Sequence, residues 1–156
     1  MTRSINNMGT ISKNFSYREF ERSATADRKG ICNVIRTFEV RDAVKELTET
    51  ILQPLRDAWG RPITINSGWR CEELNQELGG SKTSAHMTGF AADIVPDKGD
   101  VETFFQFVRK WLTESKVKFD QCAIEGDKQG KVFWVHIGLY GPGKRQFCQF
   151  YRWTKK

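Results

Sequence analysis

The residues most able to do chemistry in this 156-residue chain gather around its two histidines, His86 and His136. Asp93 follows His86 in the stretch GGSKTSAHMTGFAADI (79–94), where a polar loop gives way to apolar residues. Two imidazoles and one carboxylate suit a catalytic zinc ion, which takes three protein ligands and leaves a fourth position open. Gly89 lies between His86 and Asp93 and allows the chain to reverse tightly there. The sequence therefore predicts a zinc site of His86, Asp93 and His136.

Such a site also needs a carboxylate that is not a ligand, because a proton must leave the attacking water and reach the leaving group. Glu125 ends the predicted strand 119–125, and a hairpin turn leads from it to the predicted strand 132–139. In the second strand, alternate side chains form an apolar face, while Trp134 and His136 point the other way. The hairpin can bring Glu125 near His136, which makes Glu125 the candidate base.

Taken singly, these residues have simpler interpretations. A lone histidine in a loop is more often a surface or hydrogen-bonded residue than a ligand, and Asp93 could merely cap or solvate the end of a strand. The metal site is favoured because both histidines of the chain can be ligands of the same site.

Helices are predicted first along the chain. The capping-box pattern of Ser16 and Glu19 predicts a short helix that carries Phe20, and residues 23–36 are predicted to form a loop. An apolar stripe predicts a helix from Thr37 to Gly60, whose last turn Pro54 should kink or break. A short helix is predicted at 71–78, and a second long helix follows Asp100.

Strands are predicted at 62–66, 91–95, 119–125 and 132–139 and near 146–153. This order predicts an α+β domain in which a mostly antiparallel sheet packs against helices, with the zinc site in a cleft on the open face of the sheet. Residues 1–13 are polar and are predicted to be a flexible N-terminal segment, and residues 14–156 a single domain.

The composition limits which binding partners can be expected. The net charge of +6 either keeps the protein soluble or attracts an acidic partner such as nucleic acid, an anionic membrane or a cell-wall polymer. The basic residues are scattered and do not alternate with aromatics, which argues against a nucleic-acid groove. We find neither an apolar run long enough to span a membrane nor a secretory signal. The four cysteines are far apart, so free thiols are expected. We expect a monomer.

The stretch SAHMTGFAAD (84–93) has the form S-x-H-x-x-G-x-A-x-D and resembles the zinc-site signature of the D-Ala-D-Ala carboxypeptidase family of metallopeptidases. That family has the lysostaphin–carboxypeptidase–hedgehog type of fold. The resemblance covers roughly residues 14–139, and its further stretches are NFSYREFERSATADRKGI, ILQPLRDAWGRPITINSGWR, ELNQELGGSKTSAHMTGFAADI and FDQCAIE…FWVHIGL.

The resemblance implies that the three zinc ligands are His86, Asp93 and His136. It implies that Arg70 holds a carboxylate of the substrate, because a guanidinium matches a carboxylate in a bidentate manner; a surface ion pair is the alternative. Ser84 would orient the substrate or the metal loop, or simply shape a turn.

Glu125 corresponds to the glutamate on the strand before the third ligand, and it would act as general base and then as acid. The sequence departs from the family at two positions. Phe133 stands where many relatives carry the catalytic acid, and Trp134 stands where some carry a histidine that stabilises the oxyanion. We expect Trp134 to contact the substrate instead.

The resemblance therefore implies a zinc carboxypeptidase or endopeptidase that cuts stem or cross-bridge peptides of bacterial peptidoglycan. Small relatives without a signal peptide are often phage lysins or virion-associated proteins, which places the expected site of action at the bacterial cell wall. The alternative is a catalytically silent relative that keeps zinc as a structural or ligand-binding site.

Overall fold

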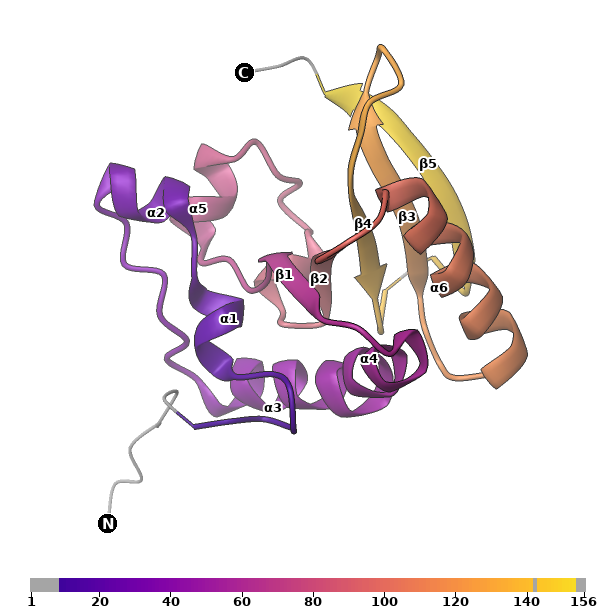
Figure 1. Cartoon of the computed structure of the whole chain (residues 1–156). Coiled ribbons are helices and arrows are strands. Elements are labelled where there is room, and N and C mark those ends of the chain that lie inside the picture. Colours follow the sequence, from indigo (N-terminus) through magenta and orange to yellow (C-terminus); the bar gives the residue numbers. More distant parts are fainter. Residues whose placement is uncertain (1–8, 142, 154–156) are drawn as a thin grey trace.

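The computed structural model describes residues 9–141 and 143–153 (Figure 1). The flexible segment predicted for residues 1–13 therefore lies mostly outside the described residues. Its last part contacts the domain, because Ser12 Oγ donates a hydrogen bond of 2.6 Å to Gln53 Oε1. The prediction of one domain over 14–156 also includes residues 142 and 154–156, which lie outside the described part.

The N-terminal half is helical. Glu19 accepts a hydrogen bond of 2.7 Å from the backbone of Ser16 and so begins α1, as the capping-box pattern predicted. The elements of this half are α1 (Tyr17–Glu21), α2 (Ala24–Lys29), α3 (Phe38–Leu47), the π-helical turn η1 (Thr48–Leu52) and α4 (Gln53–Trp59).

Two expectations in this half need correction. Residues 23–36 are not all loop, because α2 forms there between the capping side chain of Ser23 and Gly30, whose φ is +67°. Ala26 is the buried residue of this short helix. The sequence therefore shows no apolar stripe from which the helix could have been predicted. Pro54 does not break the long helix, because Leu52 and Gln53 at the start of α4 keep right-handed helical φ and ψ. The irregularity in this helix is the π-helical turn η1, which comes directly before α4.

The second half builds the sheet. Its elements are β1 (Ile63–Ser67), α5 (Glu72–Glu77), the 3₁₀ turn η2 (Ala85–Met87), β2 (Ala91–Pro96), α6 (Val101–Ser115), β3 (Gln121–Asp127), β4 (Val132–Gly138) and β5 (Gln146–Trp153). Within the described residues the strand order is β1-β2-β4-β3-β5.

The sheet is mixed, which corrects the expectation of a mostly antiparallel sheet. β3 and β5 pair in parallel, whereas the other neighbours are antiparallel. The reason lies in the connection after β4, which passes the start of β3 before β5 begins. Asp120 holds this connection, since its Oδ1 accepts from the backbone N of Lys144 at 2.9 Å and its carbonyl accepts from the backbone N of Gln146 at 2.9 Å. β5 thus enters beside β3 in the same direction.

The main core lies between one face of this sheet and the helices α3, α4 and α6 (Figure 1). Val135 and Ile137 of β4 are fully buried in it, as the alternation of the strand predicted, and Leu139 follows them. Phe133 is half-buried. The alternate residues of β2, β3 and β4 face away from this core, and they include Asp93, Glu125 and His136.

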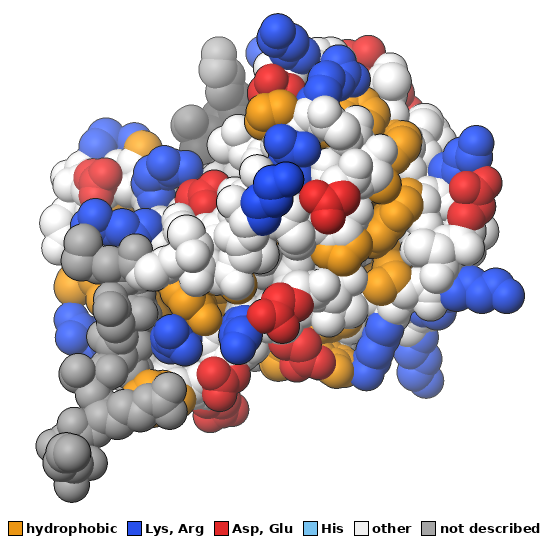
Figure 2. All heavy atoms as spheres, turned by 60° about the horizontal axis from the view of Figure 1, so that its bottom comes forward, with side chains coloured by type: hydrophobic (Ala, Val, Ile, Leu, Met, Phe, Trp, Pro, Cys, Tyr) orange, Lys and Arg blue, Asp and Glu red, His pale blue; other side chains and the backbone are white. Residues whose placement is uncertain are grey.

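The surface carries no dominant basic patch on the face shown in Figure 2, where Lys and Arg side chains of the described residues are interspersed with Asp and Glu. The helices of the described part include none that is long and apolar enough to cross a membrane.

Candidate metal centre

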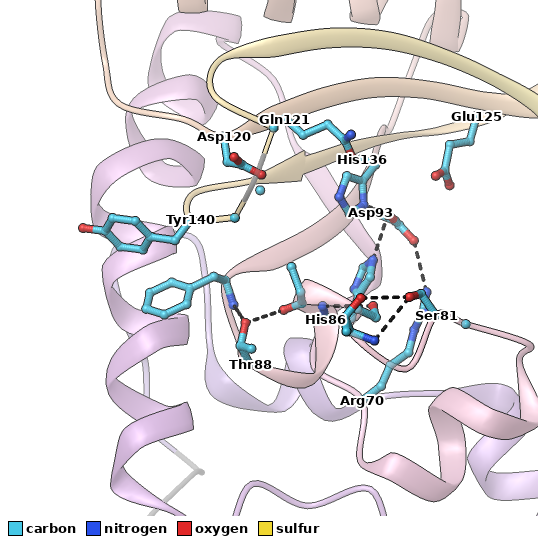
Figure 3. A pocket seen from close by; sticks show the side chains of 18 of the residues that line it. Arg70, Ser81, His86, Thr88, Asp93, Asp120, Gln121, Glu125, His136 and Tyr140 are labelled. Atoms are coloured by element: carbon cyan, nitrogen blue, oxygen red, sulfur yellow. Dashed lines mark hydrogen bonds and ion pairs between the residues drawn. The ribbon is translucent and has the colours of Figure 1, made fainter.

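Three side chains from separate elements converge on the open face of the sheet (Figure 3). Asp93 of β2 pairs directly with His136 of β4, and Asp93 Oδ1 lies 2.9 Å from His136 Nδ1. The same oxygen lies 3.3 Å from Nε2 of His86, which comes from the 3₁₀ turn η2. One ligand atom from each residue lies within 4.8 Å of the others. The structure thus brings together the three predicted ligands.

The local backbone explains how His86 reaches Asp93. Ser84 begins the turn η2, and its Oγ accepts a hydrogen bond of 3.2 Å from the backbone N of His86. Gly89 follows with a φ of +91°, a conformation that favours glycine. A Cβ there would lie 2.9 Å from the carbonyl oxygen of Val40, so the chain also approaches α3 too closely for a side chain. This confirms the tight reversal expected at Gly89.

The ring of His86 is oriented by the backbone. Its Nδ1 lies 2.7 Å from the carbonyl oxygen of Gly68, which can only accept a hydrogen bond. Nδ1 therefore carries the proton, and Nε2 presents its lone pair toward Asp93 when the ring is neutral. A histidine held in this way by its second nitrogen is the usual arrangement of a metal ligand.

Burial and mutual charge shift the pKa values of the three groups. Burial lowers the pKa of His86, although Asp93 opposes this. For His136 burial also acts to lower the pKa, but the hydrogen bond and charge of Asp93 outweigh it and the pKa is raised. For Asp93 burial acts to raise the pKa, but the two histidines outweigh it and hold the pKa well below its usual range. Asp93 is thus ionised at neutral pH.

This donor set fits zinc. Two imidazole nitrogens and one carboxylate oxygen gather around a small volume, and all three residues are buried or half-buried. Two histidine nitrogens within 3.3 Å of one carboxylate oxygen also mark a place where a cation would be favourable.

Arg70 lies beside the three candidate ligands (Figure 3). Its Nη2 is 3.5 Å from Asp93 Oδ2, its Nη1 donates to Asn75 Oδ1 at 3.3 Å, and its Nε donates to Ser67 Oγ at 3.1 Å. Burial lowers the pKa of Arg70, partly offset by the charges of Asp93 and Glu125. The guanidinium therefore contacts the carboxylate of the candidate ligand Asp93 and also lines the pocket.

Glu125 faces the same pocket from β3 and is 8% exposed. Its register partner is Trp134, and Ala123 is the residue of β3 opposite His136. The indole Nε1 of Trp134 donates a hydrogen bond to Glu125 Oε2. The structure thus gives Trp134 a contact that the sequence did not predict, and its predicted contact with a substrate stays a prediction.

An open pocket of about 940 Å³ joins these groups. Arg70, Ser84, the three candidate ligands and Glu125 all line it, whereas Trp134 is not among its described lining residues. Two further acidic residues, Asp120 and Asp127, lie close to Glu125 in the sequence, and the structure gives them different places. Asp120 lines the pocket but holds the connection to β5, while Asp127 shapes the β3–β4 turn by accepting from Gln129 and Lys131, each at 2.9 Å.

Sequence reasoning missed Asn75, which is 2% exposed. Its Oδ1 accepts from Arg70, and its Nδ2 donates to the carbonyl of Ser81 at 2.8 Å. The amide thus joins Arg70 to the loop that forms one wall of the pocket. The available signal in the sequence was the position of Asn75 next to Leu74 in a short predicted helix, because an amide that becomes buried there needs hydrogen-bond partners.

The comparison with known proteins covers the part of the chain that carries His86 and Asp93, while Glu125 and His136 lie beyond the matched residues. The family profile of Peptidase M15 matches residues 13–122, which is more than half of the chain. The zinc D-Ala-D-Ala carboxypeptidase of Streptomyces albus G is 48% identical over 44 residues. That similarity covers 28% of this chain and only 17% of the length of the relative.

Proposed function

The chain belongs to the Peptidase M15 family, and from that premise we propose that it is a zinc-dependent peptidase that hydrolyses stem or cross-bridge peptides of bacterial peptidoglycan. The observation that carries the proposal is the convergence of His86, Asp93 and His136 in one pocket with a carboxylate and a guanidinium beside them. The similarity to a zinc D-Ala-D-Ala carboxypeptidase supports the choice of metal and substrate.

The geometry supports the following roles for these residues. Zinc, when bound by His86, Asp93 and His136, would supply Lewis-acid polarisation of the scissile carbonyl and a water of lowered pKa. Glu125 would accept the proton of the attacking water and pass it to the leaving amine. Arg70 would bind a carboxylate of the peptide with its planar fork.

The pocket excludes bulk water only in part, since it is open, and the peptide itself would complete the enclosure. Burial of Glu125 and Arg70 strengthens the electrostatic interaction of each with a bound peptide, because charges interact more strongly in a less polar environment. Action on peptidoglycan would place the protein at the bacterial cell wall, as expected of a phage lysin or virion-associated protein, and the net charge of +6 suits an anionic wall.

The test is digestion of purified peptidoglycan, followed by mass analysis of the fragments. The wild-type chain loaded with zinc should release D-alanine or cleave cross-links, and a chelator should abolish the reaction. Glu125→Gln should bind zinc and fold normally but lose about 10²–10⁴-fold in rate. Asp127→Asn is the matched control, because Asp127 shapes the hairpin turn and should leave the rate unchanged.

Two results would contradict the proposal. A wild-type chain that binds zinc but cleaves no wall peptide would favour the silent relative, in which zinc has a structural or ligand-binding role. Unchanged cleavage by Glu125→Gln would remove Glu125 from the reaction and direct attention to Asp120, the other acidic residue that lines the pocket beside the three candidate ligands.

A further inference from the structure

Resting on the proposed function, we infer that Trp134 is a positioning residue, which holds the carboxylate of Glu125 in the orientation needed for proton transfer. The indole Nε1 of Trp134 donates a hydrogen bond to Glu125 Oε2. A carboxylate has two oxygens, so a bond to Oε2 is compatible with proton transfer through Oε1.

The register of the sheet places these two side chains next to each other. Glu125 of β3 and Trp134 of β4 are direct partners in an antiparallel pair, so their side chains leave the same face of the sheet as neighbours. Immediately after Glu125 the register shifts at Gly126. A Cβ on Gly126 would lie 2.2 Å from the carbonyl oxygen of Lys131, so glycine is required for this irregularity. Irregularities of this kind redirect side chains beside functional sites.

The indole acts on the carboxylate from outside the pocket. Glu125 lines the pocket, and Trp134 is absent from the described lining residues. The ring of Trp134 instead lies beside that of Phe133, with centroids 5.7 Å apart. Trp134 would therefore influence the reaction through Glu125 rather than by touching the peptide.

The hydrogen bond from Trp134 matters because it limits the rotation of the Glu125 side chain. A glutamate has three rotatable side-chain bonds, and a displacement of about 1 Å at a reacting group can cost on the order of 10²-fold in rate. A donor from the neighbouring strand restricts those rotations, because the indole is rigid and its strand is fixed by hydrogen bonds on both sides.

The contact itself is tested by NMR of the ¹⁵N-labelled full chain, without any need for activity. The indole N–H resonance of Trp134 is identified by its loss in Trp134→Phe. In Glu125→Gln this resonance should move upfield, because an amide oxygen is a weaker acceptor than a carboxylate. The indole of Trp69, which donates to the carbonyl of Met87 at 3.0 Å, serves as the internal control and should not move. A Trp134 resonance that Glu125→Gln leaves in place would overturn the inference.

The effect on catalysis is tested with Trp134→Phe, which keeps an aromatic ring and removes the donor. We expect kcat to fall by about 10–100-fold with KM and zinc content unchanged. Trp59→Phe is the matched control, since it removes a buried indole N–H for which the described residues offer no hydrogen-bond partner. It should leave kcat near the wild-type value.

A double-mutant cycle separates positioning from other roles. When Glu125 is already glutamine, Trp134→Phe should change the residual rate by less than about twofold, because its effect passes through Glu125. A full effect in that background, or a rise in KM with kcat unchanged, would show that Trp134 contacts the peptide and would overturn the inference. A wild-type chain with no turnover would defeat the proposed function, and the indole resonance would still decide whether Trp134 holds Glu125.

Discussion

Asp93 Oδ1 lies 2.9 Å from His136 Nδ1 in directly paired positions of β2 and β4, and this pair is the centre of the candidate site. The same oxygen lies 3.3 Å from His86 Nε2, while Oδ2 lies 3.5 Å from Arg70. One buried carboxylate therefore faces all three cationic or metal-binding groups. Changes at any of them should alter metal binding, stability or turnover in distinguishable ways.

The first prediction concerns the metal. The purified chain should bind close to one zinc ion, and His86→Ala and His136→Ala should each lose it, as measured by elemental analysis after gel filtration. At a free zinc concentration 100 times Kd, binding should raise the free energy of unfolding by about 2.7 kcal/mol. Asp120→Asn, in the same pocket but outside the three ligands, is the control and should keep the metal. Full occupancy in either histidine variant would refute the ligand assignment.

Arg70→Lys should weaken turnover more than it weakens zinc binding, because lysine keeps the charge but loses the fork. We expect kcat/KM to fall by about tenfold or more on a peptide with a free C-terminal carboxylate. For the same peptide with an amidated C-terminus, kcat/KM should fall much less. Arg109→Lys is the matched control, since Arg109 lies over the ring of Phe147.

Zinc affinity decides the interpretation of this variant. If Arg70→Lys lost zinc affinity as strongly as it lost turnover, Arg70 would act through its contact with Asp93 and would not be the residue that binds the peptide carboxylate.

Gly89→Ala should destabilise the fold by roughly 1–3 kcal/mol and lower zinc affinity. Its φ of +91° is strained for alanine, and the new Cβ would crowd the carbonyl of Val40, displacing the segment between His86 and Asp93. Urea unfolding and zinc titration measure the two effects. Gly99→Ala is a close control, because its φ is +90° with open space around the new Cβ. Equal zinc affinities for the two variants would show that Gly89 does not shape the site.

The metal-free protein should have its greatest stability near the ordinary pKa of histidine, about 6.5. The pKa of His136 is raised in the folded state, so its contribution is complete below about 6.5 and is lost as the pH rises through the raised value. The pKa of His86 is lowered, so its contribution is complete above about 6.5 and is lost as the pH falls through the lowered value. Urea unfolding in the presence of a chelator, from about pH 5 to 9, measures both slopes.

A single variant separates these two contributions. His136→Asn should remove the decline on the alkaline side and keep the decline on the acid side. A variant that retained the alkaline decline would place its origin in another group.

Much of the site could be predicted from local patterns in the sequence. Asp93 and His86 are close in the chain, and the glycine between them has the conformation that a tight reversal demands. The alternation along the strand 132–138 placed His136 on the side away from the core, because side chains of a strand point to opposite faces in turn. These inferences held because each depends on a few successive residues.

Only the tertiary structure decided which strands are neighbours and in what direction. β5 lies parallel to β3 because the preceding connection passes the start of β3, and a strand's own sequence does not encode its neighbour. The same register sets Trp134 against Glu125, and the packing of α5 sets Arg70 between Asn75 and Asp93. Arg70 and Asp93 are 23 residues apart in the chain, and the contact of Trp134 with Glu125 depends on the register of a hairpin. Both therefore follow from how the elements pack and pair, and not from spacing within any one segment.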